Sequence, residues 1–281
     1  MSAVFVWVSF LSDAGAQEKA EYDYTQEVDT WVRDIPSRSA EDQSGHVGIT
    51  ESEFEYAYQP KLFGQLPVKL SIDSRDMWID NSTAVDLPSH LTGVTAGVET
   101  TVPVFTLEHA YFHLGVFPSF YSDNWTFGSE NFRIPSKYYF IYVLNDKWTF
   151  VAGAAVYPRY DTNLSPILGF IYKPNDKLTF YLVPDRPNVS YALTDRLTLF
   201  AEGWDKTDDE YIVDRGTAKN VTLKYAEGHL GTGIRFKLTQ DAQIILSGGE
   251  IFNNYLDYLD GNGKVDMKNG PYVELRFTMK I

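Results

Sequence analysis

The chain has 281 residues, a net charge of −14, a sequence pI near 4.7 and no cysteine. This acidic balance disfavours nucleic-acid binding, which needs a basic surface, and the lack of cysteine excludes disulfides and thiolate metal sites. Hydrophobic residues make up 44% of the chain, which excludes global disorder, and no apolar run reaches the roughly 18 residues of a transmembrane helix.

The N-terminus has the pattern of an export signal. Ala3-Val-Phe-Val-Trp-Val-Ser-Phe-Leu11 is an apolar stretch of the length of a signal-peptide core, and Ala14-Gly-Ala16 is similar to a cleavage site. We therefore expect residues 1–16 to be a signal peptide, shortened at its charged end, and residues 17–281 to form one domain. The alternative is a buried first strand.

Alternating segments follow along the whole chain, and each reads as a strand because strand side chains repeat every two residues. Glu21–Arg33 gives the weakest alternation and residues 51–281 give a clear one. Both regions together give fourteen strands; if Glu21–Arg33 is only a periplasmic or plug segment, another boundary is wrong and twelve strands are expected, because such barrels have an even number. The strands of the clear region are expected at 51–63, 65–80, 91–104, 107–121, 136–144, 147–160, 164–174, 176–185, 187–194, 196–205, 224–238, 241–256 and 270–281.

A short motif separates several of these segments. Leu144-Asn-Asp-Lys-Trp-Thr-Phe150 recurs as Pro174-Asn-Asp-Lys-Leu-Thr-Phe180, then as Leu193-Thr-Asp-Arg-Leu-Thr-Leu199, and weakly from Leu238. Asn and Asp favour tight turns because they bond their own backbone. The other connections, such as Asp205–Ala218 and Asp257–Gly270, are longer and polar. Short turns on one rim and long loops on the other are typical of outer-membrane barrels.

The last ten residues alternate without a break. Val273, Leu275, Phe277, Met279 and Ile281 fall on one face, and Glu274, Arg276, Thr278 and Lys280 fall on the other. A transmembrane barrel needs this pattern, with apolar side chains toward lipid and polar ones toward the lumen. The sequence thus predicts an all-β fold, a transmembrane antiparallel up-and-down β-barrel of about 12–14 strands.

Charged residues in the lumen phase are the candidate functional residues. Buried charges must be paired or hydrated, so they would either line a wet channel or close the interior with ion pairs. The candidates are Lys69, Glu99, Lys137, Glu202, Arg235, Lys237, Glu274, Arg276 and Lys280.

The other motifs in the sequence do not predict a metal site or a catalytic site. Asp260 and Asn262 match two positions of a calcium loop, but its first and twelfth positions are Tyr258 and Asn269, so a Gly-rich loop is the better interpretation. His109 and His113 lie about 13 Å apart on one strand face, too far to hold one metal. We expect no catalytic site, metal or cofactor.

These features together resemble bacterial outer-membrane β-barrels of the porin type, in an uncharacterised family defined as a domain of unknown function. The resemblance rests on the Ala-x-Ala signal, the repeated turns and the final strand, whose apolar face is similar to a recognition signal for the barrel-assembly machinery. That signal usually ends in Phe, whereas this chain ends in Ile281. The resemblance implies an outer-membrane location, contact with lipid and lipopolysaccharide, and passage of small solutes.

Two alternatives to a passive channel or small-solute transporter remain at this stage. One is a structural or adhesive barrel with a closed lumen. The other is a soluble secreted β-sandwich that binds glycans, although Trp148, Phe150 and Phe180 directly after turns speak against it, because they are placed as a membrane-interface girdle would be.

Overall fold

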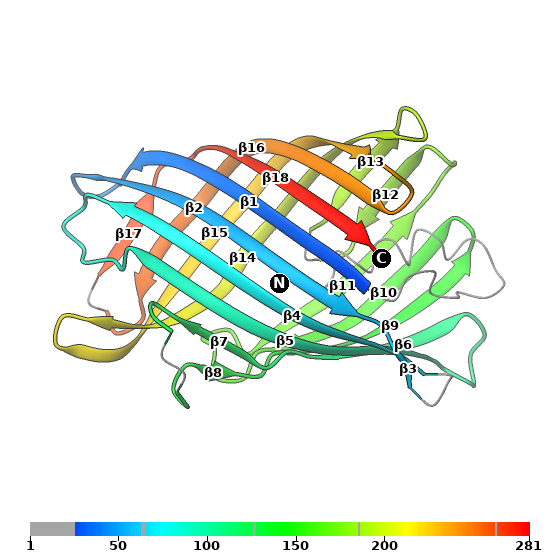
Figure 1. The fold of residues 1–281 in the computed structure, drawn as a ribbon, viewed down its shortest axis with the longest axis horizontal. Helices are drawn as coiled ribbons and strands as arrows, with labels where there is room; N and C mark the ends of the chain where they lie inside the picture. Colours follow the sequence, from blue (N-terminus) through cyan, green and yellow to red (C-terminus); the bar gives the residue numbers. More distant parts are fainter. Residues whose placement is uncertain (1–25, 63–65, 126–127, 185, 262) are drawn as a thin grey trace.

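The chain forms a closed, all-β barrel (Figure 1). The computed structural model describes residues 26–62, 66–125, 128–184, 186–261 and 263–281. Within them no helix is long and apolar enough to cross a membrane. The strands are β1 (Gln26–Ser39), β2 (His46–Tyr58), β3 (Lys61–Leu62), β4 (Leu66–Asn81), β5 (His90–Pro103), β6 (Ala110–Val116), β7 (Ser119–Ser122), β8 (Phe132–Arg133), β9 (Ser136–Asn145), β10 (Trp148–Val156), β11 (Leu164–Tyr172), β12 (Leu178–Leu182), β13 (Asn188–Ala192), β14 (Leu197–Arg215), β15 (Ala218–Lys237), β16 (Ala242–Tyr258), β17 (Lys264–Met267) and β18 (Gly270–Lys280).

These segments make fourteen barrel strands, the upper end of the predicted range. Pro118 separates β6 from β7 and Pro135 separates β8 from β9, because proline has no N–H to give to a ladder. β17 and β18 likewise follow one another along β16. β3 pairs only with the start of β4, outside the main sheet.

The first and last strands close the barrel. β1 pairs antiparallel with β18 from Glu27↔Lys280 to Asp34↔Val273, so the blue and red strands lie side by side in Figure 1. The weakest predicted strand, Glu21–Arg33, therefore exists, and it runs on to Ser39. Residues 21–25 and the predicted signal peptide at 1–16 lie outside the described residues.

Burial is inverted relative to a soluble protein. In β2, Glu51, Glu53 and Glu55 are at most 3% exposed, whereas Phe54 between them is 49% exposed. The final strand repeats this: Glu274 and Arg276 are buried while Val273 and Leu275 are about half exposed, and Ile281 is exposed too. Apolar side chains outside and charges inside are what a bilayer requires.

The repeated motif forms the turns at one end, here called the short-turn rim. Asn145 Oδ1 accepts the backbone N–H of Lys147 and Trp148 at 2.9 and 3.0 Å, and Asn175 Oδ1 repeats this with the next turn. Thr194 and Thr239 do the same through their hydroxyls. The shared turn chemistry inferred from the sequence is confirmed, and its cause is one side chain that accepts two backbone donors.

Substitution of Asn175 tests this role. Because Asn175→Ala removes the acceptor of two exposed backbone bonds, we expect the free energy of unfolding to fall by about 1 kcal/mol. Asp176→Ala, at an exposed neighbour in the same turn, should change it by less than half of that. Reversible denaturant unfolding in lipid vesicles measures both, and equal losses would contradict the assignment.

The predicted loop at Asp205–Ala218 is wrong. It is the upper part of a long hairpin, in which β14 pairs with β15 as far as Arg215↔Ala218. Figure 1 shows this yellow hairpin at the end of the barrel opposite the C-terminus, here called the long-loop rim. The strand escaped detection because Tyr211, Ile212 and Val213 are all buried, so both of its faces are covered and it does not alternate.

An apolar core fills the lumen on the long-loop side. β14 bends inward there, and Ile212 pairs in parallel with Ser122 of β7, which is not its neighbour around the wall. The buried residues that form this core, here called the upper core, come from β1, β2, β4, β5 and β14–β18. They are Ile35, Ala40, Val47, Ile49, Met77, Ile79, Leu91, Tyr211, Val213, Val221, Leu223, Tyr225, Ile251, Leu256, Tyr258, Val265, Met267 and Tyr272.

Candidate functional site

The predicted lumen charges fall into two groups. Lys69, Glu99, Lys137, Glu202, Glu274 and Arg276 are buried, each 8% exposed or less, whereas Arg235 and Lys280 are half-buried and Lys237 is exposed. The structure brings together Lys69 and Glu99, at 3.8 Å, and joins Glu202 to Glu274 through Arg186. Lys137 and Arg235 instead lie over the rings of Phe117 and Phe200.

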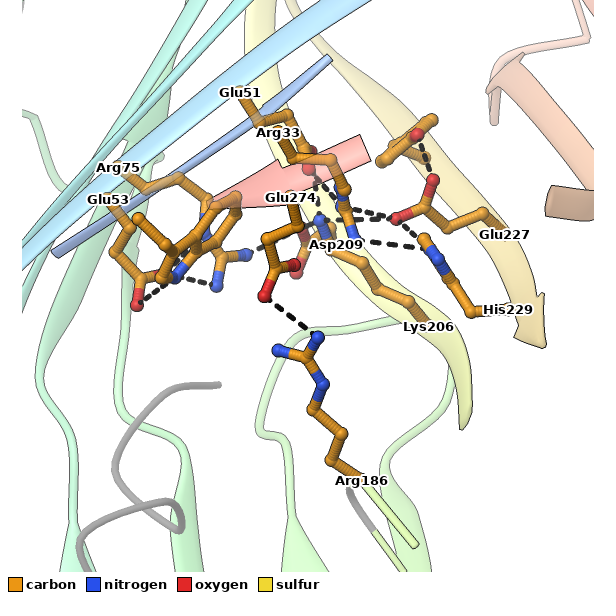
Figure 2. A network of polar contacts seen from close by, with 12 residues as sticks. Arg33, Glu51, Glu53, Arg75, Arg186, Lys206, Asp209, Glu227, His229 and Glu274 are labelled. Carbon is orange, nitrogen blue, oxygen red and sulfur yellow. Dashed lines mark hydrogen bonds and ion pairs between the residues drawn. The ribbon is translucent and has the colours of Figure 1, made fainter. Parts of the chain in front are cut away.

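A larger network lies at mid-height, between the upper core and the short-turn rim (Figure 2). It was missed as a site by the sequence analysis. Four cations take part with six carboxylates, so the network carries two excess negative charges with neutral histidine. Its members, here called the central network, are Arg33, Glu51, Glu53, Arg75, Arg186, Glu202, Lys206, Asp209, Glu227, His229 and Glu274.

Arg75 ties opposite walls of the barrel together. It lies on β4, and its guanidinium contacts Glu53 at 2.7 Å and Asp209 of β14 at 2.9 Å. Five strands separate β4 from β14 in one direction around the wall and seven in the other. Trp31 donates from Nε1 to Glu53 at 3.1 Å and holds that carboxylate in place.

Lys206 makes the second connection from β14. Its Nζ lies 3.0 Å from Glu51 of β2 and 2.8 Å from Asp209. The inner part of β14 is thus held by ion pairs to two strands of the opposite wall. All of these side chains are buried, so water does not screen the pairs as it would at a surface.

Arg33 joins β1 to β15. It bonds Glu51, lies 2.6 Å from Glu227 and contacts the His229 ring nitrogen Nε2 at 3.2 Å. Tyr225 donates its hydroxyl proton to Glu227, which connects the network to the upper core. In Figure 2 these side chains point toward one another across the lumen.

Arg186 lies at the bottom of the network as drawn in Figure 2. It contacts Glu202 at 2.9 Å and Glu274 at 2.8 Å, and its guanidinium lies 4.1 Å from the centroid of Trp204. Trp204 stacks in turn on His229, with ring centroids 4.1 Å apart. The arginine is therefore neutralised by two carboxylates and covered by an aromatic face.

A separate group of ion pairs lies between the central network and the short-turn rim. Lys69 contacts Glu55 at 2.7 Å, and His113 lies 3.4 Å from Glu99. Arg276 lies 3.5 Å from Asp29. The inward faces of β1, β2, β4 and β18 are therefore charged along much of their length, and β5 adds Glu99.

The opposite wall of the lumen is apolar. The buried side chains of β9–β12 and of the β10–β11 connection form a second cluster, here called the apolar wall. Its members are Tyr139, Ile141, Val151, Ala155, Tyr157, Tyr160, Ile167, Ile171, Tyr181 and Val183. The lumen thus has a charged side and an apolar side.

Metal binding finds no support in the described residues, where no three His, Asp, Glu or Cys side chains are grouped suitably for an ion. Asp260 lies in the connection between β16 and β17, and Asn262, the other residue of the weak calcium motif, lies outside the described residues.

Some network members had a readable signal. Glu51 and Glu53 alternate along one strand, and Glu227 and His229 are in phase with the predicted lumen residue Arg235. Lys206 and Asp209 had no such signal, because they belong to the stretch predicted as a loop.

The sequence profile of a domain of unknown function, DUF6268, matches residues 81–279 of this chain. The chain belongs to the DUF6268 family. The match begins at the end of β4 and covers every later barrel strand. The search for curated relatives found no match.

Solved structures similar to this DUF6268 barrel include an outer membrane channel, a FadL homologue and a porin. An outer membrane channel from Pseudomonas putida F1 aligns with a TM-score of 0.51 at 10% identity, covering 95% of this chain and 100% of the other. A FadL homologue from Pseudomonas aeruginosa gives 0.48 at 12% identity, with 92% and 90% covered, and the NanC porin gives 0.43 at 12%, with 91% and 100% covered. The likeness to the Pseudomonas putida channel, at 10% identity, shows the fold alone, a porin-like barrel.

Proposed function

We propose that this chain is an outer-membrane channel for small solutes whose lumen is closed in the described state by the inner part of β14. The observation that carries the proposal is the pair of cross-lumen connections, Arg75 to Asp209 and Lys206 to Glu51, which fasten β14 against the opposite wall. A permanently wide pore is incompatible with these contacts, because side chains that meet across a lumen exclude a water column between them.

The arrangement supports a gated channel more than a purely structural barrel. A barrel that only needs to be stable gains little from buried ion pairs, since well-packed apolar residues serve equally well or better. Ion pairs between walls, in contrast, can separate in discrete steps and be replaced by water when a strand moves. We therefore propose that these ion pairs hold the channel closed and that the channel opens when they separate.

The proposed location is the bacterial outer membrane, with the lipid-facing side chains in contact with phospholipid and lipopolysaccharide. Support comes from the inverted burial and from the short-turn and long-loop asymmetry. The apolar face of β18 (Val273, Leu275, Phe277, Met279 and Ile281) is proposed as the segment that the barrel-assembly machinery recognises. Membrane fractionation, with gel mobility compared before and after boiling, tests the location, since a folded barrel migrates differently from the unfolded chain.

Conductance across planar bilayers tests the channel. We expect the wild-type protein to give brief, infrequent openings, and sucrose to enter proteoliposomes slowly. Removal of the cross-lumen pairs should increase the open fraction. If neither the wild-type protein nor any network variant conducts, the closed structural barrel is the better assignment.

A further inference from the structure

The wall of the barrel is interrupted on one side. β12 and β13 have five residues each, whereas β14 and β15 have 19 and 20. Five tilted strand residues rise about 13 Å, compared with the roughly 25 Å apolar band of an outer-membrane barrel. Pro184 and Pro187 flank the tip of the β12–β13 hairpin and end the ladders there, because neither has an N–H to donate.

The neighbouring edge of β11 is left without a strand partner. Among the described residues, the register between β11 and β12 has three pairs, from Phe170↔Leu182 to Tyr172↔Phe180. On its other side β11 pairs with β10 over all nine residues. The N–H of Lys173 points to Lys147, just before β10, so the even-numbered residues Leu164, Pro166 and Leu168 direct their backbone groups away from β10.

Pro166 fits this open edge. None of the three positions has a register partner on β12, and Pro166 is the one of them with no N–H to leave without a strand partner. Leu164 and Leu168 are 62% and 67% exposed, so the outer face of the edge is apolar and suited to hydrocarbon. Backbone groups at membrane depth are tolerated without strand partners only where they face protein or a water-containing lumen.

The interruption has defined borders. The tip of the β12–β13 hairpin lies below it, where the carbonyl of Pro187 accepts the N–H of Gly203 at the last contact between β13 and β14. Above it, Asp161 donates its backbone N–H to Glu210 of β14 at 2.7 Å and accepts from Lys224 of β15 at 3.0 Å. Between these limits no strand among the described residues pairs with the facing edges of β11 and β14.

The β11 side of the interruption is apolar, whereas the facing stretch of β14 carries the exposed Asp205 and the buried Lys206, Asp209 and Glu210. Ile167, Ile171 and Val183 of the apolar wall lie on or beside its inner face. Arg186 at the hairpin tip is held by Glu202 and Glu274 and covered by Trp204, so it offers no unmatched positive charge to an anion.

We propose that the interruption between β11 and β14 is a lateral route by which small, uncharged, mainly apolar molecules exchange between the lumen and the bilayer. The inference deepens the proposed channel function and rests on it. It commits to apolar solutes because both sides of the β11 edge are apolar and because a charged molecule loses its hydration in passing toward hydrocarbon.

Thiol labelling tests the route, and the lack of cysteine in the chain makes single-cysteine variants unambiguous. Ile167→Cys places a thiol inside the barrel behind the interruption. The matched control is Val151→Cys, also buried in the apolar wall, on β10, which is paired on both sides. Leu168→Cys, on the lipid face of the same edge, marks full access from the bilayer. Each folded variant in proteoliposomes is treated with pyrene maleimide dissolved in the lipid.

We expect Cys at 167 to react at least about tenfold faster than Cys at 151, because a fully paired wall has no passage through it for a bilayer-confined reagent. All three variants must label equally after denaturation. Equal slow rates at 167 and 151 in the folded barrel would overturn the lateral route. Conductance of the same vesicles is recorded in parallel, so that failure of the channel and failure of the lateral route are distinguished.

Uptake of N-phenyl-1-naphthylamine, an uncharged aromatic amine, tests the class of solute in intact cells with a lipopolysaccharide outer leaflet. Expression of the Ile167→Cys protein should speed uptake, and attachment of pyrene at that thiol should abolish the increase. The same adduct at Leu199→Cys, on the outer face of the paired part of β14, should leave uptake unchanged. No increase on expression, or an increase that survives the adduct at 167, overturns the proposal.

Discussion

Replacing Arg75 with alanine is expected to open the barrel and to destabilise it. The change leaves Glu53 and Asp209, 2% and 8% exposed, without the guanidinium that contacts both. Removing one member of a buried ion pair costs about 3–5 kcal/mol, because the remaining charge stays buried and uncompensated. The strand β14 also loses one of its two ion-pair connections to the opposite wall, so we expect a higher open fraction in planar bilayers.

Two further variants separate gating from stability. In the triple variant Arg75→Met, Glu53→Gln and Asp209→Asn no buried charge of this group is left unpaired, so much of the lost stability should return while the open fraction stays high. Lys219→Ala breaks the exposed pair between Lys219 and Asp214 and should leave both the free energy of unfolding and the conductance almost unchanged, because water screens an exposed pair. Unchanged conductance in both Arg75 variants would show that the cross-lumen ion pairs do not keep the channel closed.

The second large effect is expected on the outer surface. Leu275 is 51% exposed in the middle of β18, between Val32 of β1 and Leu246 of β16. Because these neighbours are apolar and face the same way, Leu275→Arg would place a charge in hydrocarbon. The expected loss in the free energy of unfolding from lipid vesicles is about 2–4 kcal/mol, with slower insertion into membranes.

A conservative change provides the control. Leu275→Ala keeps the face apolar and should cost well under half as much as the arginine, because a lipid-facing side chain leaves no buried cavity. In a soluble β-sandwich the arginine would be a harmless surface substitution. Equal stability of the Leu275→Arg and wild-type proteins would therefore contradict the membrane assignment of this face.

The alternation of residues was sufficient to predict the barrel, because a strand between lipid and lumen has one required polarity on each face. Glu274 and Arg276 against Val273 and Leu275 show this at the C-terminus. The turns were also predictable, since the residues that begin them, such as Asn145 and Asn175, act on backbone groups only two and three positions away. Local chemistry of this kind is contained within a few residues of sequence.

The inner part of β14 was not predictable by the same rule. Its residues Asp209 to Val213 are buried on both faces, one against the upper core and the other toward Asp161. A strand that leaves the wall and enters the lumen no longer has a lipid face, so its alternation disappears. The run of acidic and apolar residues then looks like a loop.

The sequence by itself determined which residues face lipid, how many strands there are to within two, and where the short turns lie. Only the tertiary structure decided that ion pairs and the upper core cross the lumen, which carboxylate each inward cation contacts, and how short β12 and β13 are. Arg75 and Asp209 are 134 residues apart in the chain, and Arg33 and Glu227 are 194 apart. The position of a residue along a strand determines whether its side chain points toward lipid or toward the lumen. Which side chain it contacts across the lumen depends on barrel closure, strand tilt and the bend of β14, and those are properties of the whole sheet.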